Sequence, residues 1–503
     1  MTETMSSPFK SVALVLNSYF GPFMMELAKI LREQHGSAIH LYCKSDILAT
    51  QYRNGPHAEL FASVTNFMRF PPALRDTALD EAAELALARD WERRLGLTFN
   101  TLAVANRHVG RGYALGGFYH PDSEYANASY VQMVHAYNVQ LGFWEREFRD
   151  KGITLVLADN KEIANVAQMM RISYRSMARA RYKNFHYWEE NETREADAIR
   201  RIYEILPPRR KEAAGDAEVL PPYVAGAEII RRAMQRAKWT MVVRQSAYLL
   251  ARQAYWHMRG YEKARGYYVL DQIRMLVRQR RDIHRMMGQE TVTLEALEGT
   301  PFIYYPLHTE PEQSLGQISP EFFFQLTAIA ALSRDLPAGF KLAVKDVPMG
   351  CGRRPDNFYD QILRLKNVVI LNLSVPGPEV VRRAVGVATI AGTGGLEAAL
   401  MGKPVISFGR HNPYNFLPHV MVVKDLSDLP AFVRKMVGDE VDTARARGDA
   451  ERYIEAIEAV SFDMGKFDYF DLNRFAADAP QNAYRLLHKS LEETGSRAAQ
   501  TAL

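Results

Sequence analysis

The sequence predicts an α/β protein with two Rossmann-like lobes, a helical insertion between them and a helical C-terminus. Three observations favour this fold class. Short apolar runs alternate with a helical pattern over residues 11–43, which is typical of a βαβ unit and a parallel sheet. The same alternation returns with short loops over residues 300–408. Between them, residues 190–290 keep helical spacing and are rich in Arg, Glu, Met and Tyr.

The composition limits the class of protein. At about 100–200 residues per domain, 503 residues predict two to four domains. The two cysteines are far apart and give neither a metal-type spacing nor a disulfide framework, so we expect a cytoplasmic protein without a metal. We find no secretory signal and no run of about 18 apolar residues, which predicts a soluble or peripheral protein. A net charge of +5 is too small to indicate nucleic acid as a partner.

Four regions follow from these patterns. We predict an N-terminal Rossmann-like lobe over residues 1–189 and a helical insertion over 190–299. A C-terminal Rossmann-like lobe follows over 300–435, and residues 436–503 form C-terminal helices.

The expected strands place the polar loops of each lobe. The long helix of the first half covers Ser129–Lys151, and a further helix begins at Lys161. The strands of the first half are Ser11–Asn17, Ala38–Cys43, Thr101–Ala105 and Ile153–Ala158. Those of the second half are Phe302–Tyr305, Phe340–Lys345, Val368–Leu371, Val387–Ile390 and Pro404–Phe408. Ligands of such sheets bind at the carboxyl ends of the strands, so residues that follow strands are the candidates.

A glycine-rich turn follows the strand Val387–Ile390. It contains Gly392, Thr393, Gly394 and Gly395 and opens a helix that carries Glu397. Glycines allow close approach of a ligand, and the free N–H groups of a helix start suit a phosphate. Glu397 could accept hydrogen bonds from ribose hydroxyls. The alternative is a tight turn that only packs the helix onto the sheet.

Two more candidate segments follow strands of the second half. His308 and Glu310 come directly after Phe302–Tyr305, where the imidazole could bind phosphate or act as a general acid or base. Alternatively, His308 caps the strand and Glu310 is solvated. Lys345 ends the next strand, where it could meet a diphosphate as a point charge.

The first half offers a carboxylate and a basic cluster. Asp159 follows its most apolar strand and could serve as base or nucleophile in glycosyl transfer, or simply as the N-cap of the next helix. Arg107, His108 and Arg111 could hold an anionic acceptor, although a glycine-hinged surface loop is the alternative.

The helical stretch from Arg231 to Arg285 combines many basic residues with aromatic ones. Its apolar residues mostly recur at helical spacing, which favours packing in a core. The alternative is a basic and aromatic face that rests on an anionic membrane surface.

Five segments of the second half share their order and spacing with a known family. They are Tyr304–Glu312, Leu336–Lys345, Asn367–Leu371, Ala391–Ala398 and Gly402–Gly409. Over about residues 300–425 this series resembles the capsule polysaccharide biosynthesis family, whose best understood members are bacterial Kdo transferases that build capsule linkers on a lipid. The N-terminal half is similar only in layout.

The resemblance implies a GT-B-like fold, with a nucleotide-sugar donor in the C-terminal lobe and an acceptor in the N-terminal lobe. By that resemblance, Lys345 and the Gly392–Glu397 turn hold the donor nucleotide. The family usually has an acidic residue and then His-Pro after the lysine, whereas this chain has Asp346, Val347 and Pro348. That histidine is associated with binding the phosphate of a cytidine nucleotide, so its absence counts against a CMP-linked donor.

The resemblance therefore implies a glycosyltransferase of capsule or surface polysaccharide biosynthesis, with a nucleotide-sugar as substrate and no separate cofactor. Its partners would be a glycan or glycolipid acceptor and an anionic membrane surface. Two alternatives stay open: a non-catalytic protein of polysaccharide assembly or export, and a nucleotide-sugar epimerase of similar fold.

Overall fold

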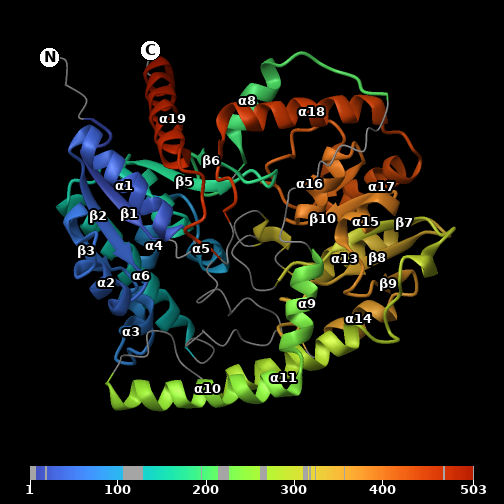
Figure 1. Ribbon diagram of the computed structural model, residues 1–503, viewed down its shortest axis with the longest axis horizontal. Coiled ribbons are helices and arrows are strands. Elements are labelled where there is room, and N and C mark those ends of the chain that lie inside the picture. The colour runs from blue at the N-terminus through green and yellow to red at the C-terminus, as the bar shows by residue number, and fades with distance from the viewer. Residues whose placement is uncertain are drawn as a thin grey trace. The chain divides into compact units, whose positions relative to one another are not determined.

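The computed structural model describes two compact units (Figure 1). The described residues are 7–16, 20–105, 128–193, 195–212, 226–260, 269–309, 315, 319–322, 324–355, 357–467 and 471–501. The first unit is built from the described parts of Met1–Leu102, Ala128–Ile202 and Glu455–Leu503. The second is built from those of Ala103–Asn127 and Tyr203–Ile454.

The first unit contains a seven-stranded sheet in the order β13-β6-β5-β4-β1-β2-β3. The pairs from β3 to β5 are parallel, whereas β6 and β13 are added as antiparallel strands at one side. The strands are β1 (Ser11–Val15), β2 (Ala38–Cys43), β3 (Phe61–Asn66), β4 (Leu155–Leu157), β5 (Ser173–Arg179), β6 (Phe185–Glu189) and β13 (Phe462–Asp463). Strands β1 and β4 are neighbours although they are distant in sequence, so a topological switch point lies between them.

Local signals set the helices of this unit. Helix α1 (Gly21–His35) starts with Pro22 in its first turn and ends at Gly36, whose φ of 61° is left-handed. Helix α6 (Tyr130–Asp150) begins at Ser129 with a capping box to Gln132. The remaining helices are α2 (Asp46–Arg53), η1 (Ala58–Leu60), α3 (Phe70–Leu74), α4 (Glu81–Leu95), α5 (Phe99–Ala105) and α7 (Lys161–Met169).

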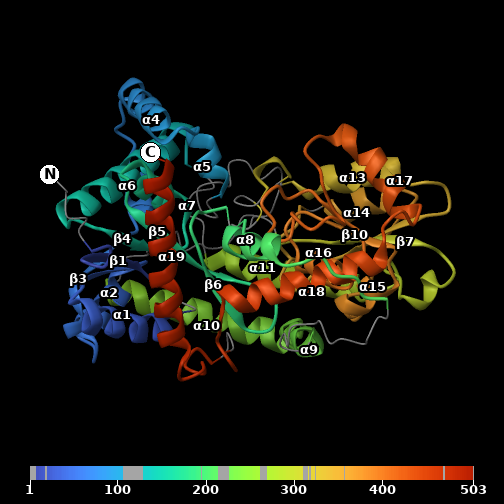
Figure 2. The ribbon, with the colours of Figure 1, turned by 90° about the horizontal axis from the view of Figure 1, so that it is seen from above.

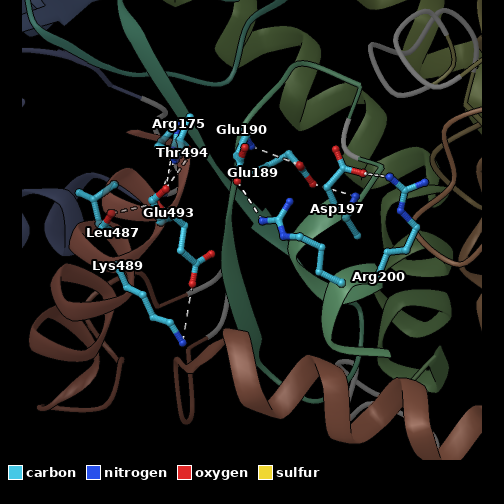
Figure 3. Close-up of polar contacts among 12 residues, drawn as sticks. Arg175, Glu189, Glu190, Asp197, Arg200, Leu487, Lys489, Glu493 and Thr494 are labelled. Carbon is cyan, nitrogen blue, oxygen red and sulfur yellow. Dashed lines mark hydrogen bonds and ion pairs between the residues drawn. The ribbon is translucent and has the colours of Figure 1, made fainter. Parts of the chain in front are cut away.

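The C-terminal helix α19 (Ala479–Thr501) belongs to the first unit. Buried Arg175 of β5 anchors it, because its guanidinium donates to the Ser490 carbonyl at 2.7 Å and to Thr494 Oγ1 at 2.8 Å (Figure 3). Trp188 Nε1 also donates to the Ala483 carbonyl at 2.8 Å. The chain thus returns to its first sheet, and the predicted C-terminal region 436–503 is divided between the two units.

The second unit contains six parallel strands in the order β12-β11-β10-β7-β8-β9. They are β7 (Phe302–Pro306), β8 (Lys341–Lys345), β9 (Val368–Ile370), β10 (Gly386–Thr389), β11 (Val405–Ser407) and β12 (Val420–Val422). Counted from β7, this is the doubly wound order 3-2-1-4-5-6. The helices around it are η3 (Glu295–Leu297), η4 (Pro320–Phe322), α13 (Gln325–Asp335), α14 (Phe358–Arg364), α15 (Gly377–Arg383), α16 (Thr393–Leu400), η5 (Leu426–Asp428) and α17 (Leu429–Val437).

Further helices precede and follow these strands in the sequence. Helices α8 (Asp197–Ile205), α9 (Gly226–Arg236), α10 (Trp239–Met258) and α11 (Val269–Met286) come before β7, and α18 (Thr443–Val460) comes after α17. Ile283 and Met286 of α11 are fully buried in the same core as strands β7 and β8. The stretch predicted as an insertion over 190–299 therefore contributes to the core of the second unit.

The predicted class of two Rossmann-like lobes is confirmed by the two sheets, but some elements differ. Thr101–Ala105 is not a strand; it lies in α5, because Phe99, Leu102 and Ala103 are buried at the i, i+3, i+4 spacing of a helix. The helix expected from Lys161 ends at Met169 and gives way to the β5–β6 hairpin, which the sequence reading missed.

Candidate functional site

The site lies at the switch point of the second sheet. Strand β7 pairs with β8 on one side and with β10 on the other, and all three run parallel. Their carboxyl ends share one edge, so the residues after them meet there. The Leu307 N–H donates to the Lys345 carbonyl at 2.8 Å, and the Ala391 N–H donates to His308 Nε2 at 2.9 Å. The predicted convergence of the segments after Tyr305, Lys345 and Ile390 is thus observed for their described residues.

His308 joins two of these loops. Its Nε2 accepts from Ala391, so the ring proton resides on Nδ1, which donates to Gln325 Oε1 at 3.0 Å. Gln325 also accepts the His308 N–H at 2.6 Å and donates to its carbonyl at 2.9 Å. The imidazole is only 7% exposed. Both ring nitrogens are therefore engaged within the protein, an arrangement that fixes the turn after β10.

The glycine turn needs its small residues for packing as well as for access. A Cβ at Gly395 would lie 2.5 Å from Thr389 Cγ2 and would collide with the Tyr414 hydroxyl. A Cβ at Gly392 would lie 2.8 Å from Thr389 Oγ1, which accepts the Gly392 N–H at 3.0 Å. The predicted packing role of the turn and its open N-terminus coexist, because α16 starts at the sheet edge with Thr393 exposed.

Glu397 lies one turn into α16. Its carboxylate is partly buried near Tyr304 of β7, and it has no hydrogen-bond partner among the described residues. Burial raises the pKa of Glu397 from 4.5 to about 7. A carboxyl group that gains its proton near neutral pH is common at functional sites.

Lys345 provides a positive charge at this edge of the second sheet. Its side chain is buried at the end of β8, and Nζ lies 3.4 Å from the Asp346 carbonyl oxygen. Burial lowers the pKa of the Lys345 ammonium, and the nearby Asp346 carboxylate partly offsets this. A desolvated ammonium of this kind gains strongly from an incoming anion.

A buried ion pair holds the loop after Lys345. Asp346 and Arg354 are both fully buried, with Arg354 Nη2 2.8 Å and Nε 3.1 Å from the carboxylate oxygens. Tyr359 Oη donates to the same carboxylate at 2.6 Å. On the other side, the Gly352 N–H donates to Asp282 of α11 at 2.9 Å. The loop is therefore rigidly attached to α11, and Val347 stands 37% exposed on it.

Asp159 occupies the corresponding place in the first unit. It follows β4, directly beside β1, at the switch point of that sheet. The N-cap of α7 is Asn160, whose Oδ1 accepts from the Ile163 N–H at 3.1 Å, so the alternative of Asp159 as N-cap is wrong. Glu162 on the next turn is 3% exposed and accepts from the Tyr137 hydroxyl at 3.2 Å.

Four predicted residues lie outside the described residues: Glu310, Arg107, His108 and Arg111. In the part of the chain that the structure describes, no group of three or more His, Cys, Asp or Glu residues could hold a metal ion. Within those same residues, no helix is long and apolar enough to cross a membrane.

The family comparison bears on the second unit. Residues 202–416 match the family model "Capsule polysaccharide biosynthesis protein". The predicted resemblance to this family is confirmed. This match starts near the beginning of the longer segment of the second unit, Tyr203–Ile454, so it takes in α9 to α11 as well as β7 to β11. No curated protein matches the chain.

Solved structures similar to this chain are remote. Two are Thermosulfurimonas dismutans KpsC structures, a "beta Kdo 2,4 transferase" (12% identity, 60% of this chain and 80% of that chain, TM-score 0.29) and a "beta Kdo 2,7 transferase" (13%, 69% and 89%, TM-score 0.33). Another is Anabaena Alr3699/HepE in complex with UDP and glucose (12%, 96% and 100%, TM-score 0.32).

Sequence reasoning missed Gln325 and Thr389, because they contact His308 across 17 and 81 residues of the chain. The pair of Asp346 and Arg354 joins residues only eight apart, and Asp346 gave a signal as the acidic residue after Lys345.

Proposed function

We propose that this protein is a glycosyltransferase that transfers a sugar from a nucleotide-sugar donor during capsule or surface polysaccharide biosynthesis. The family match supports a role in polysaccharide biosynthesis. The observation that supports the proposal is that the α16 N-terminus and Lys345 lie at the same edge of the second sheet, on either side of the end of β7.

The geometry suits a nucleoside diphosphate or monophosphate. Helix α16 presents the N–H groups of its first turn, which favour anions. Lys345 adds a buried positive charge at the end of β8, which is separated from β10 by β7. Glu397 of α16 offers a carboxylate to the ribose hydroxyls. Gly392, Thr393, Gly394 and Gly395 would form the wall against the phosphates, and we propose that Glu310 completes this side.

The proposed role of His308 changes with its contacts. We propose that it positions the turn at Ala391, since both of its ring nitrogens already bind the protein. Asp159 remains our proposed base or nucleophile on the first unit. Arg107, His108 and Arg111 remain the proposed contacts of an anionic acceptor.

Nucleotide binding and sugar transfer test the proposal separately. In a thermal-shift series with CMP, UDP, GDP and CDP, one nucleotide should raise the melting temperature by mass action. With the matching nucleotide-sugar and a glycan acceptor, the protein should release that nucleotide. Lys345→Met should abolish both effects, whereas Lys341→Met, at the opposite end of the same strand, should preserve them.

The two alternatives give different outcomes. A non-catalytic assembly protein would bind nucleotide without releasing it from a sugar. An epimerase would convert the nucleotide-sugar without an acceptor. If none of the four nucleotides binds, the proposal is wrong.

A further inference from the structure

Helix α10 carries an unusually apolar exposed surface. Of 14 large hydrophobic side chains that are exposed among the described residues, six belong to α10 and two to α11. Those of α10 are Trp239, Val243, Tyr248, Leu250, Tyr255 and Met258, with exposed fractions between 45% and 76%. Large apolar patches on a folded protein generally mark a binding surface.

These side chains share one side of the helix. Val243, Leu250 and Met258 recur at intervals of seven and eight residues, so they lie on one strip along the axis, and exposed Ala247 and Ala254 lie between them. Tyr248 and Tyr255 border that strip. The two buried residues of α10, Val242 and Leu249, lie on the opposite side, toward α11. The helix therefore packs through a narrow seam and leaves a wide apolar face uncovered.

The charged residues of α10 itself are of one sign. Helix α10 contains no Asp or Glu, but Arg244 and Arg252 lie within it. Lys238 and Arg259 stand at its two ends. An apolar face with only positive charges on the same helix is complementary to a surface that has a hydrocarbon interior and anionic headgroups.

The aromatic residues fit the same surface. Arg259 lies over the Tyr255 ring at 5.5 Å, and Arg280 of α11 lies over the Trp239 ring at 4.5 Å from its centroid. Trp and Tyr with an adjacent cation prefer the boundary between hydrocarbon and lipid headgroups. At about 30 Å, a helix of 20 residues could span a bilayer, but α10 is not apolar enough for that.

We propose that α10 is an interfacial helix that docks the protein on a bilayer containing anionic phospholipids. Figure 1 shows α10 reaching away from the second sheet, to which α11 returns through buried Ile283 and Met286; the turned view of Figure 2 shows the same separation of α10 from β10. Since α11 also contacts the loop after Lys345 through Asp282, the docking helix and the site belong to the same compact unit. The binding surface itself does not depend on the proposed sugar transfer.

Vesicle binding tests the inference without any nucleotide. The full chain should co-sediment with vesicles of phosphatidylcholine and phosphatidylglycerol, and much less with phosphatidylcholine alone. The double variant Val243→Glu/Leu250→Glu should lower the partition coefficient at least about tenfold, because it removes apolar contact and adds repulsion. The matched control Leu87→Glu/Ile205→Glu also changes two exposed side chains outside α10 and should bind as before.

Two further measurements make the outcome decisive. Both double variants should melt as the parent does, since all four side chains are at least 45% exposed. Equal binding of variant and parent, or no binding to anionic vesicles, would overturn the inference. A parent that is a dimer, with a monomeric Val243→Glu/Leu250→Glu variant and no lipid binding, would overturn it in favour of a second copy as the occupant of this face.

Discussion

The backbone N–H of Ala391 donates a hydrogen bond of 2.9 Å to Nε2 of His308, and this bond joins the two loops that flank the switch point of the second sheet. Because Nε2 is an acceptor, the imidazole is neutral, and its Nδ1 proton is directed to Gln325. The histidine that the sequence marks as an acid, base or phosphate ligand is thus placed to hold the glycine turn in position.

Replacing His308 with alanine should loosen the turn. The buried Ala391 N–H would lose its acceptor, which costs about 1–3 kcal/mol in the free energy of unfolding. Nucleotide affinity should fall as well, because the start of α16 would no longer be fixed. Chemical denaturation and calorimetry of His308→Ala measure the two effects.

His419 provides a matched control for that variant. It is also buried, and its Nε2 donates to the Ala399 carbonyl at 2.9 Å, near the far end of α16. His419→Ala should cost similar stability but leave nucleotide affinity unchanged. If both variants bind nucleotide as the parent does, His308 has no positioning role in binding.

The fold was predictable where one local pattern sufficed. The strands β1, β7, β8 and β10 follow from apolar runs, and the end of α1 follows from Gly36. The return of the C-terminal helix to the first sheet was not predictable, because it depends on Arg175 meeting Ser490 and Thr494, more than 300 residues later. Helix α5 was misread because Thr101 and Val104 favour strands, whereas burial of Phe99, Leu102 and Ala103 decides for a helix.

The candidate site was predictable in its parts but not in its connections. Each loop follows a strand, so Lys345 and the turn at Gly392 could be found from the sequence. That His308 accepts from Ala391, and that Asp346 is neutralised by Arg354, depend on side-chain directions that no spacing encodes.

The ammonium of Lys345 should supply most of the charge for a phosphate. We expect Lys345→Met to reduce nucleotide affinity at least about tenfold, since a buried charge-assisted contact would be lost. Burial lowers the pKa of Lys345, so affinity in the parent should also decline at alkaline pH below the usual titration range of lysine. Calorimetry across pH checks both, and Lys341→Met should follow the parent at every pH.

The buried pair of Asp346 and Arg354 should be strongly coupled. Asp346→Asn leaves the fully buried guanidinium without its counter-charge, which should cost about 3–5 kcal/mol. The double variant Asp346→Leu/Arg354→Met removes both charges and should recover much of that loss. Denaturant unfolding measures the free energies of unfolding of the double variant and of Asp346→Leu and Arg354→Met alone. If the loss in the double variant equals the sum of the two single losses, the two charges are not coupled.

Glycine is required at position 395 by the contact between α16 and β10. Gly395→Ala places a Cβ 2.5 Å from Thr389 Cγ2 and against the Tyr414 hydroxyl, so α16 must shift. We expect a loss of about 1–3 kcal/mol in the free energy of unfolding. Gly394→Ala should cost less, because the nearest atoms to its Cβ would be Pro306 Cγ at 3.3 Å and Tyr304 Cε1 at 3.5 Å. Equal melting temperatures of the two variants would exclude this close approach.

Glu397 should make both stability and nucleotide binding depend on pH near neutrality. Burial raises its pKa from 4.5 to about 7, so the folded protein keeps a proton that the unfolded chain has released. The contribution of Glu397 to the free energy of unfolding is therefore full below about pH 4.5 and is lost as pH rises toward about 7. Glu397→Gln should flatten the stability profile over this pH range, and above about pH 7 the variant should be more stable than the parent.

Nucleotide affinity should have the opposite pH dependence. A deprotonated Glu397 accepts ribose hydroxyls better, so nucleotide affinity in the parent should rise as pH increases through about 7 and stay flat in Glu397→Gln. Glu189 is the control, because burial also raises its pKa to about 7, in the first unit. Glu189→Gln should alter the stability profile and leave the pH dependence of binding intact. If binding in the parent does not change between about pH 6 and pH 8, Glu397 is not a ribose ligand.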